Sequence, residues 1–194
     1  MFYRFAHRLV KCIFWLMYRL KVVGLEKVPK GAGVISGNHT SNLDSIIIGL
    51  SLPPDDGPRF MAKKELFKFK PFGWLISALG AYPVDRGKAD IKAIKTSLGI
   101  LRSGHKLLVF PEGRRVAESE AADVKNGAAM LASRTNSPIV PVYISRGRKP
   151  FINKITVVFG EPFKFEKDKK AVSPKDYPAI IDDVMREVGR LGGA

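Results

Sequence analysis

The chain has 194 residues, 45% of them apolar, which is enough for one sizeable hydrophobic core and argues for a single domain. Its 33 lysines and arginines against 18 acids give a net charge of +15, which implies an anionic partner: nucleic acid, an anionic lipid surface or a phosphorylated substrate. The single cysteine, Cys12, excludes an internal disulfide, and three histidines argue against a metal site. No stretch approaches the roughly 18 uninterrupted apolar residues of a membrane span.

The first 25 residues contain basic side chains and no acidic one. At about 100° per residue, cations cluster on one face of a helix, with His7 beside them, and apolar residues gather opposite. The cations are Arg4, Arg8, Lys11 and Arg19, and the apolar residues are Phe2, Phe5, Leu9, Ile13, Leu16, Met17 and Leu20. This pattern is typical of an amphipathic helix in a membrane interface, with Trp15 and Tyr18 suited to the headgroup layer. A terminal helix packed on the domain's own core is the alternative.

Strand and helix patterns alternate through the rest of the chain. The sequence predicts strands at 33–37, 59–62, 81–84, 106–110, 139–144 and 155–159, and helices at 43–50, 71–79, 89–102, 126–133 and 177–191. Such alternation predicts a single α/β domain with a mostly parallel mixed sheet flanked by helices, in which the last strand pair is antiparallel. We therefore divide the chain into an interfacial helix at 1–23 and a domain at 24–194.

Several common catalytic signatures are missing from the sequence. It contains no Gly-x-Ser-x-Gly elbow, no Gly-x-x-x-x-Gly-Lys loop, no His-Glu-x-x-His and no Gly-x-Gly-x-x-Gly. Hydrolases of the elbow type, nucleotide hydrolysis and dinucleotide redox chemistry therefore lose support.

The motif NHTSNLD follows the strand expected at 33–37 and places Asp44 five residues after His39. Residues 41–44 also spell a capping box, so Asp44 has an alternative role at the start of a helix. The C-terminal end of a strand that leads into a helix is, however, where open α/β sheets bind ligands. A histidine paired there with a carboxylate can act as a general base, with the carboxylate fixing the imidazole tautomer.

Two further strand ends carry charged residues. The segment FPEGRR supplies Glu112, Gly113, Arg114 and Arg115, and AYPVDRG supplies Asp85 and Arg86. Arginine forks suit phosphate, and a glycine lets the backbone come close to a ligand. Taken singly, these could be an ordinary charged turn and a surface ion pair. With the His39 motif they predict one basic pocket.

These residues carry a resemblance to a known family. NHTSNLD resembles the His-x-x-x-x-Asp motif of the glycerolipid acyltransferases of the lysophosphatidic acid (1-acylglycerol-3-phosphate) acyltransferase type. GAYPVDRG, FPEGRR and SPIVPVYI, at 80–87, 110–115 and 137–144, are similar to that family's second, third and fourth blocks, in the same order and spacing. The resemblance covers residues 24–162, and four blocks in order are specific where one would be weak.

The resemblance implies a fatty acyl transfer from an acyl thioester, acyl-CoA or acyl-carrier protein, to a lysophospholipid hydroxyl. The acceptor would be 1-acylglycerol-3-phosphate and the product phosphatidic acid, a step of phospholipid biosynthesis. By the same carry-over, His39 is the general base and Asp44 orients it. The residues expected to bind or organise the acceptor's glycerol phosphate are Arg86, Glu112, Gly113 and Arg115, with Lys63 as a further phosphate partner. We expect no metal and no prosthetic group, and a structural role for Pro141.

An anionic membrane is the expected location, with the protein peripheral or monotopic on the cytoplasmic face and acyl-carrier protein as a further partner. The third block departs from the family at Arg114, where Thr or Ser is usual, and at Val116, where Ser is usual. An added cation could strengthen phosphate binding or suit another headgroup, so glycerol-3-phosphate or another lysolipid is an alternative acceptor. A basic nucleic-acid-binding domain would also explain the charge, but no stacking platform or helix-turn-helix pattern occurs, and we expect no nucleic acid.

Overall fold

The computed structural model describes residues 2–85, 91–111, 121–147, 149–165 and 172–193, with backbone alone at 2–6 and 121–125. Its helices are α1 (Phe2–Tyr18), α2 (Asp44–Ser51), α3 (Lys70–Ala78), α4 (Ile91–Arg102), α5 (Ala121–Thr135) and α6 (Tyr177–Gly192). Its strands are β1 (Lys21–Val23), β2 (Gly33–Gly37), β3 (Arg59–Lys63), β4 (Ala81–Val84), β5 (Lys106–Val109), β6 (Ile139–Ile144) and β7 (Thr156–Phe159). The strands and helices expected within 24–194 are present, with ends shifted by up to five residues, and short 3-10 turns are added. The helix expected over 1–23 is shorter: it ends at Tyr18, and Lys21–Val23 instead form β1, which pairs with β7.

The strands form one sheet in the order β1-β7-β6-β2-β5-β3-β4. From β6 to β4 each neighbouring pair is parallel, whereas β7 runs antiparallel to β6 and β1 parallel to β7. The mostly parallel mixed sheet and its antiparallel final pair are therefore confirmed. Because β2, β5, β3 and β4 all point the same way, the segments that follow them emerge at one edge of the sheet, the edge where such folds bind ligands.

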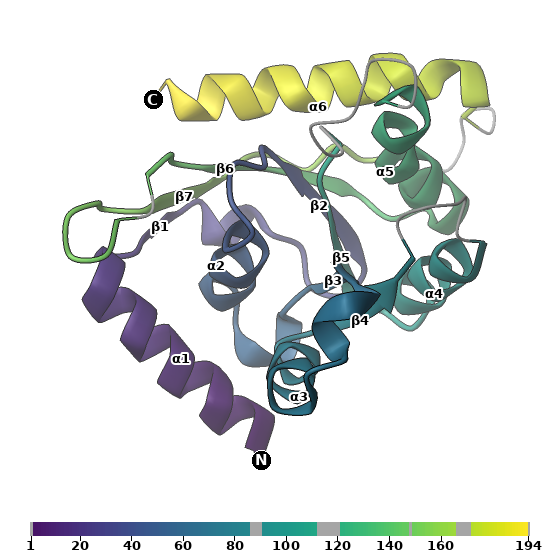
Figure 1. Cartoon of the computed structure of the whole chain (residues 1–194). Helices are drawn as coiled ribbons and strands as arrows, with labels where there is room; N and C mark the ends of the chain where they lie inside the picture. Colours follow the sequence, from purple (N-terminus) through teal and green to yellow (C-terminus); the bar gives the residue numbers. More distant parts are fainter. Residues whose placement is uncertain (1, 86–90, 112–120, 148, 166–171, 194) are drawn as a thin grey trace.

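Helices cover both faces of the sheet (Figure 1). Successive residues of a strand point to opposite faces, and in β2 Val34 and Ile35 accordingly belong to two different apolar clusters. One cluster contains residues of α1, α2 and α3, and the other contains residues of α4, α5 and α6. The fold is thus a three-layer α/β/α sandwich whose central strands β2, β5 and β6 are buried on both sides, which explains their continuous apolar runs.

Helix α1 packs on the domain along one side only. His7 and Tyr18 are buried, and Phe14 packs against the same core cluster as Tyr18. Leu9, Ile13, Trp15 and Leu16 are exposed. His7 and Tyr18 therefore differ from expectation: neither lies toward solvent or a headgroup layer, because both positions fall on the side that meets the domain.

The alternative account of the N-terminal helix, packing on the domain's own core, holds for one side of it. It covers the core with one side and presents an apolar stripe with the other, along which Arg8 and Arg19 are also exposed. Within the described part of the chain, no helix combines the length and the low charge that crossing a bilayer requires.

Candidate active site

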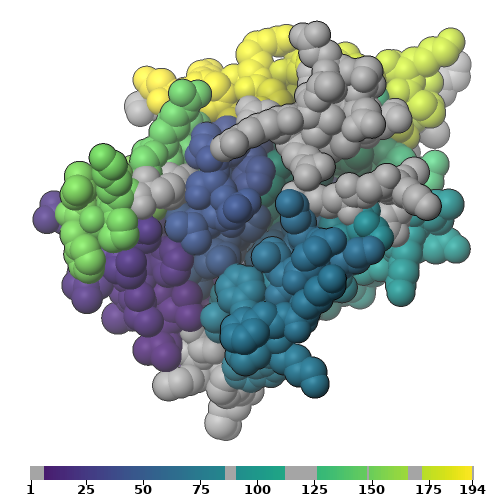
Figure 2. Space-filling view, in the orientation of Figure 1, coloured from purple at the N-terminus to yellow at the C-terminus, as the bar shows by residue number. Residues whose placement is uncertain are grey.

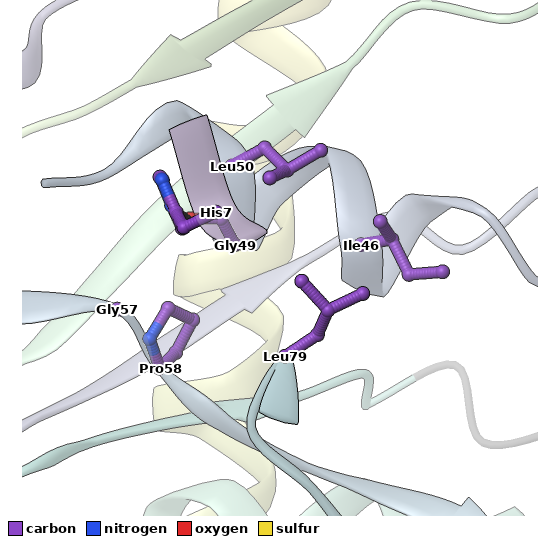
Figure 3. A pocket seen from close by; sticks show the side chains of 7 residues that line it. All are labelled: His7, Ile46, Gly49, Leu50, Gly57, Pro58 and Leu79. Atoms are coloured by element: carbon purple, nitrogen blue, oxygen red, sulfur yellow. Dashed lines mark hydrogen bonds between the residues drawn. The ribbon is translucent and has the colours of Figure 1, made fainter. Parts of the chain in front are cut away.

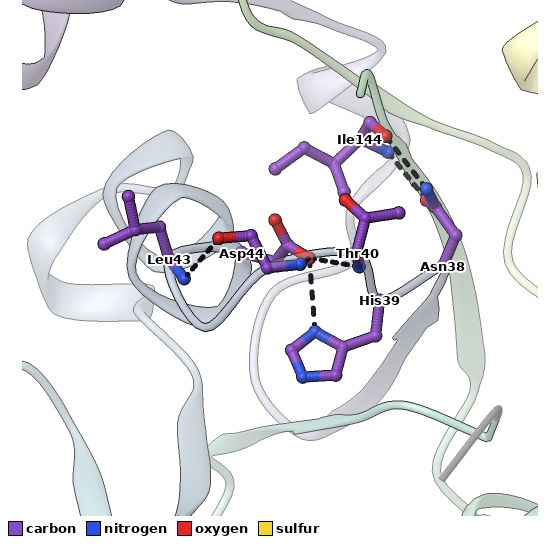
Figure 4. Close-up of polar contacts among 7 residues, drawn as sticks. Asn38, His39, Thr40, Leu43, Asp44 and Ile144 are labelled. Atoms are coloured by element: carbon purple, nitrogen blue, oxygen red, sulfur yellow. Dashed lines mark hydrogen bonds and ion pairs between the residues drawn. The ribbon is translucent and has the colours of Figure 1, made fainter. Parts of the chain in front are cut away.

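His39 and Asp44 lie together just beyond the end of β2 (Figure 4). His39 Nδ1 is 3.2 Å from Asp44 Oδ2. The imidazole is 27% exposed, whereas the Asp44 side chain is fully buried. The pair therefore consists of a buried carboxylate that holds one ring nitrogen and an imidazole that reaches the surface, which is the arrangement of a histidine base with its orienting acid.

Backbone hydrogen bonds fix the Asp44 carboxylate. The amides of Thr40 and Ser41 both donate to Asp44 Oδ2 at 2.7 Å. The bond from Ser41 is the one a capping box predicts, but Ser41 Oγ accepts from the amide of Leu43 at 3.2 Å instead of that of Asp44. Asp44 consequently fills both roles considered from the sequence: it stabilises the start of α2 and it contacts His39.

Phe110 contacts one face of the His39 ring. Its ring stacks on the imidazole, with centroids 4.1 Å apart and an angle of 11° between the planes. Phe110 follows β5, which pairs directly with β2, so the first and third motifs meet across neighbouring strands. The sequence analysis placed Phe110 at the end of an apolar strand and at the start of the third motif but gave it no role in the site, so this contact is a site feature that it missed.

Asn38 anchors the segment that carries His39. Its side-chain amide donates to the carbonyl of Ile144, and its side-chain oxygen accepts from the amide of Ile144, both at 2.9 Å (Figure 4). A side-chain amide thereby continues the pairing between β2 and β6 one residue beyond Gly37, the last residue of β2 in register with β6. The fourth motif, which ends at Ile144, thus supports the first. Pro141 of the same motif is buried within β6, in agreement with a structural role.

The remaining residues expected in the pocket fall into two groups. Arg86, Glu112, Gly113 and Arg115, like Arg114, lie outside the described residues. Lys63 is described: it ends β3 at the same edge of the sheet as His39, with its side chain exposed. Asp85 pairs with Lys64 at the surface, so for this acid the surface ion pair considered as an alternative is present.

The pocket drawn in Figure 3 lies elsewhere. It is small and is lined by His7, Ile46, Gly49, Leu50, Gly57, Pro58 and Leu79. None of these residues was expected to take part in catalysis or binding, and His7 comes from α1. The pocket therefore lies at the interface between α1 and the rest of the domain. In the described ranges, His, Cys, Asp and Glu side chains form no group of three that could hold a metal ion.

The comparisons with known proteins show the class of this protein. The family model described as Acyltransferase matches residues 19–145, and the chain belongs to that family. The acyltransferase activity expected from the four motifs is confirmed at this level.

Individual relatives agree with the family. The 1-acyl-sn-glycerol-3-phosphate acyltransferase of Bacillus subtilis (strain 168) is 34% identical over 190 residues, which are 95% of this chain and 94% of the relative. The enzyme of the same name from Streptococcus pneumoniae is 29% identical over 205 residues, 98% of this chain and 73% of the relative. The crystal structure of the 1-acyl-sn-glycerophosphate (LPA) acyltransferase PlsC from Thermotoga maritima superposes with a TM-score of 0.69 at 26% identity, covering 97% of this chain and 79% of that one.

Proposed function

We propose that the protein transfers a fatty acyl group from an acyl thioester to the free hydroxyl of 1-acylglycerol-3-phosphate and so makes phosphatidic acid. The observation that carries this is the His39–Asp44 pair, 3.2 Å apart at the ligand-binding edge of the sheet. The names of the relatives support this acceptor, and family membership favours acyl transfer over the nucleic-acid-binding alternative. The thioester is acyl-CoA or the acyl thioester of acyl-carrier protein.

In the proposed reaction His39 is the general base. With Nδ1 held by Asp44, the imidazole would use Nε2 to accept the proton of the acceptor hydroxyl as its oxygen attacks the thioester carbonyl carbon. The buried carboxylate stabilises the imidazolium that forms, and the two amide donors keep the carboxylate in place.

The tetrahedral intermediate then collapses by breaking the carbon–sulfur bond. The departing thiolate, from a thiol of pKa about 8.5, needs little help from an acid and takes the proton held by His39. Direct transfer needs no acyl-enzyme, no metal and no prosthetic group. Cys12 is exposed on α1 and is not part of this scheme.

Acceptor binding is assigned to the basic residues of the second and third motifs. Arg86 and Arg115 would grip the phosphate with planar, paired N–H donors, and Lys63 would add a charge at the end of β3. Glu112 would hold an arginine fork, and Gly113 would let the backbone approach the glycerol phosphate. Fixing the phosphate holds the hydroxyl near His39, a positioning effect worth several kcal/mol, or about 7–11 kcal/mol when complete.

The test is thiol release from one acyl-CoA with a panel of acceptors. We expect 1-acylglycerol-3-phosphate to accelerate release most, ahead of glycerol-3-phosphate and a lysolipid with a neutral headgroup. A preference for glycerol-3-phosphate would replace the proposed acceptor with the alternative one. An Arg115→Ala variant should lose mainly the use of phosphate-bearing acceptors, and equal loss with a phosphate-free acceptor would contradict its role.

The base is tested with His39→Ala and Asp44→Asn, each checked for folding by circular dichroism. Loss of the base should lower kcat by about 10²–10⁴-fold. His105→Ala is the matched control, because His105 is exposed and lies beside the opposite end of β5. Near-normal transfer by a folded His39→Ala protein would show that another group is the base.

The boundary expected after residue 23 moves toward the N-terminus, because Lys21–Val23 form β1 of the sheet and are not part of the helix. We propose α1 as the membrane-interface element, with the protein peripheral or monotopic on the cytoplasmic face. The exposed stripe of α1 supports this, because it joins Leu9, Ile13 and Leu16 in a segment without acids. Serine at these three positions should lower binding to anionic vesicles about tenfold or more, with α1 still packed through its buried side. Unchanged vesicle binding would assign α1 a packing role only.

A further inference from the structure

The segment between β6 and β7, residues 145–155, ends in an exposed apolar tip. We call this segment the β6–β7 loop. Phe151 is 71% exposed and Ile152 is 76% exposed. Phe151 has a φ of 62°, in the left-handed region that bulky residues rarely adopt. The chain thus holds a large apolar side chain outward in a backbone conformation that bulky residues rarely adopt.

Hydrogen bonds within the β6–β7 loop give it a defined shape. Asn153 Oδ1 accepts from the amide of Lys149 at 2.9 Å, and the amide of Asn153 donates back to the carbonyl of Lys149 at 3.0 Å. At its base, the amide of Ser145 donates to the carbonyl of Thr156 at 2.9 Å. Phe151 and Ile152 therefore lie in a turn that is closed by the two hydrogen bonds between Lys149 and Asn153.

The β6–β7 loop is bonded to the end of α1. The amide of Phe151 donates to the carbonyl of Met17 at 2.6 Å, and the amide of Ile155 donates to the carbonyl of Tyr18 at 3.0 Å. Figure 1 shows the loop beside the C-terminal end of α1, and in Figure 2 the two segments adjoin on one face of the molecule. Near this junction α1 exposes 61% of Trp15 and 67% of Leu16. Hydrogen bonds between backbone atoms thus connect the apolar tip to the helix that carries the apolar stripe.

The charges that α1 and the β6–β7 loop themselves carry are of one sign. Residues 1–25 and 124–160 contain no aspartate or glutamate. Exposed cations lie on both elements: Arg8, Arg19, Arg146, Lys149 and Lys154. Apolar side chains surrounded by cations with long aliphatic stems suit the boundary between the headgroups and acyl chains of an anionic bilayer. An acidic protein partner would satisfy the charges, but it would not account for an apolar tip that projects this far.

We propose that the β6–β7 loop is a second membrane-docking element, in which Phe151 and Ile152 insert into the acyl boundary of an anionic bilayer alongside the exposed stripe of α1. This rests on the membrane location in the proposed function, and it adds a second, rigidly connected point of contact. Two points of contact fix the orientation of the domain relative to the bilayer. A single helix lying on the surface leaves the domain free to rotate about the helix axis.

Insertion of the tip is tested with an environment-sensitive fluorophore on the full chain. Cys12→Ser removes the natural thiol, and Ile152→Cys or, as a matched control, Ile91→Cys supplies a new one. Ile91 is also well exposed, at 65%, but lies on α4 away from α1 (Figure 1). With vesicles containing phosphatidylglycerol, the label at position 152 should shift to the blue and the label at 91 should not. A bound protein whose label at 152 does not respond overturns the proposal.

The contribution of the tip to affinity is tested with Phe151→Asn combined with Ile152→Ser, since asparagine tolerates a positive φ. We expect vesicle binding to weaken about tenfold or more, and Ile91→Ser to leave it unchanged. Turnover of a short-chain soluble substrate should stay at the wild-type level, whereas turnover of vesicle-borne substrate should fall. Unchanged binding by the double variant overturns the proposal. Because binding is measured without catalysis, failure of the proposed acceptor specificity would not affect this result.

Discussion

The rings of His39 and Phe110 lie nearly parallel, with their centroids 4.1 Å apart, and this contact joins two motifs that are about 70 residues apart in the chain. Asp44 contacts the imidazole at one nitrogen only, so this contact alone does not stop the ring from tilting. The Phe110 ring, stacked against one face of the imidazole, limits that tilting. Phe110 is accordingly a positioning residue for His39.

Replacing Phe110 with alanine should lower kcat by about 10–100-fold with a smaller effect on KM, because His39, the proposed base, loses its alignment and the residues proposed to bind the acceptor are unchanged. Steady-state kinetics with a fixed acyl-CoA measure both constants. Phe110→Tyr keeps the ring and should retain most of kcat. A Phe110→Ala protein that changed only KM would mean that the ring contacts substrate instead.

Asn38 is expected to affect both stability and catalysis. Asn38→Ala removes two hydrogen bonds to Ile144, so the amide and carbonyl of this buried residue lose their side-chain partners. The expected cost is about 1–3 kcal/mol in the free energy of unfolding. The next residue is His39, so kcat should fall as well. Urea unfolding and kinetics on the same preparations test this. Asn38→Asp keeps the acceptor for the Ile144 amide but turns a second acceptor toward the Ile144 carbonyl, so it should not restore wild-type stability. An Asn38→Ala protein with wild-type stability and activity would rule out the anchor.

Lys106 offers the opposite case, a buried charge far from the chemistry. Its ammonium is fully buried, forms an ion pair with Asp56 and donates to the carbonyl of Gly31 at 3.1 Å. Lys106 begins β5 and is paired with Gly33, at the edge opposite His39. Lys106→Met should therefore lower the free energy of unfolding by about 1–3 kcal/mol, as judged by urea unfolding, with kcat retained.

The exposed pair of Lys64 and Asp85 is the matched control for stability. Because water screens exposed charges, Lys64→Met should change the free energy of unfolding by less than about 1 kcal/mol. Equal losses in the Lys64 and Lys106 variants would mean that burial of the ammonium is not what matters.

His7 should make stability depend on pH. Burial lowers the pKa of its imidazole below 6.5, a hydrogen bond to the Gly49 carbonyl partly opposes this, and the charge of Lys11 lowers the pKa further. The folded state then binds a proton less readily than the unfolded state. The stabilising contribution is present above about pH 6.5 and is lost as the pH falls below that value.

Thermal unfolding measured between pH 7.5 and 5.5 tests the His7 effect. The midpoint should fall more steeply with acidification for the wild type than for His7→Gln, which cannot be protonated in this range. Parallel curves for the two proteins would show that His7 is not the group responsible. The comparison with the variant removes the contributions of all other titrating groups.

The sequence predicted the parallel strands and the His39–Asp44 pair because both follow from local patterns: buried apolar runs, and a motif placed where one run ends. It did not predict β1, since a three-residue strand at the edge of the sheet gives no periodic signal and depends on its pairing with β7. The helix at 126–133 proved longer, because its first turns lack the apolar spacing that the prediction relied on.

Other features depend on neighbours that only the folded chain supplies. His7 was grouped with the cations of α1, and it is buried because α2 brings the Gly49 carbonyl to that side of the helix. The stacking of Phe110 on His39 and the grip of Asn38 on Ile144 arise from the order of β5, β2 and β6 in the sheet. No spacing within one motif encodes that order.

The stretch from Ile144 to Ile155 begins at the residue that Asn38 holds and ends at the residue bonded to Tyr18 of α1. Hairpin connections at a protein's surface usually accept insertions or exchange with a homologue's loop. This one should not, because a change in its length would shift both attachment points together. Grafting or shuffling of acyltransferase segments should therefore place its junctions outside β6 and β7, so that the hairpin and α1 are moved as one unit.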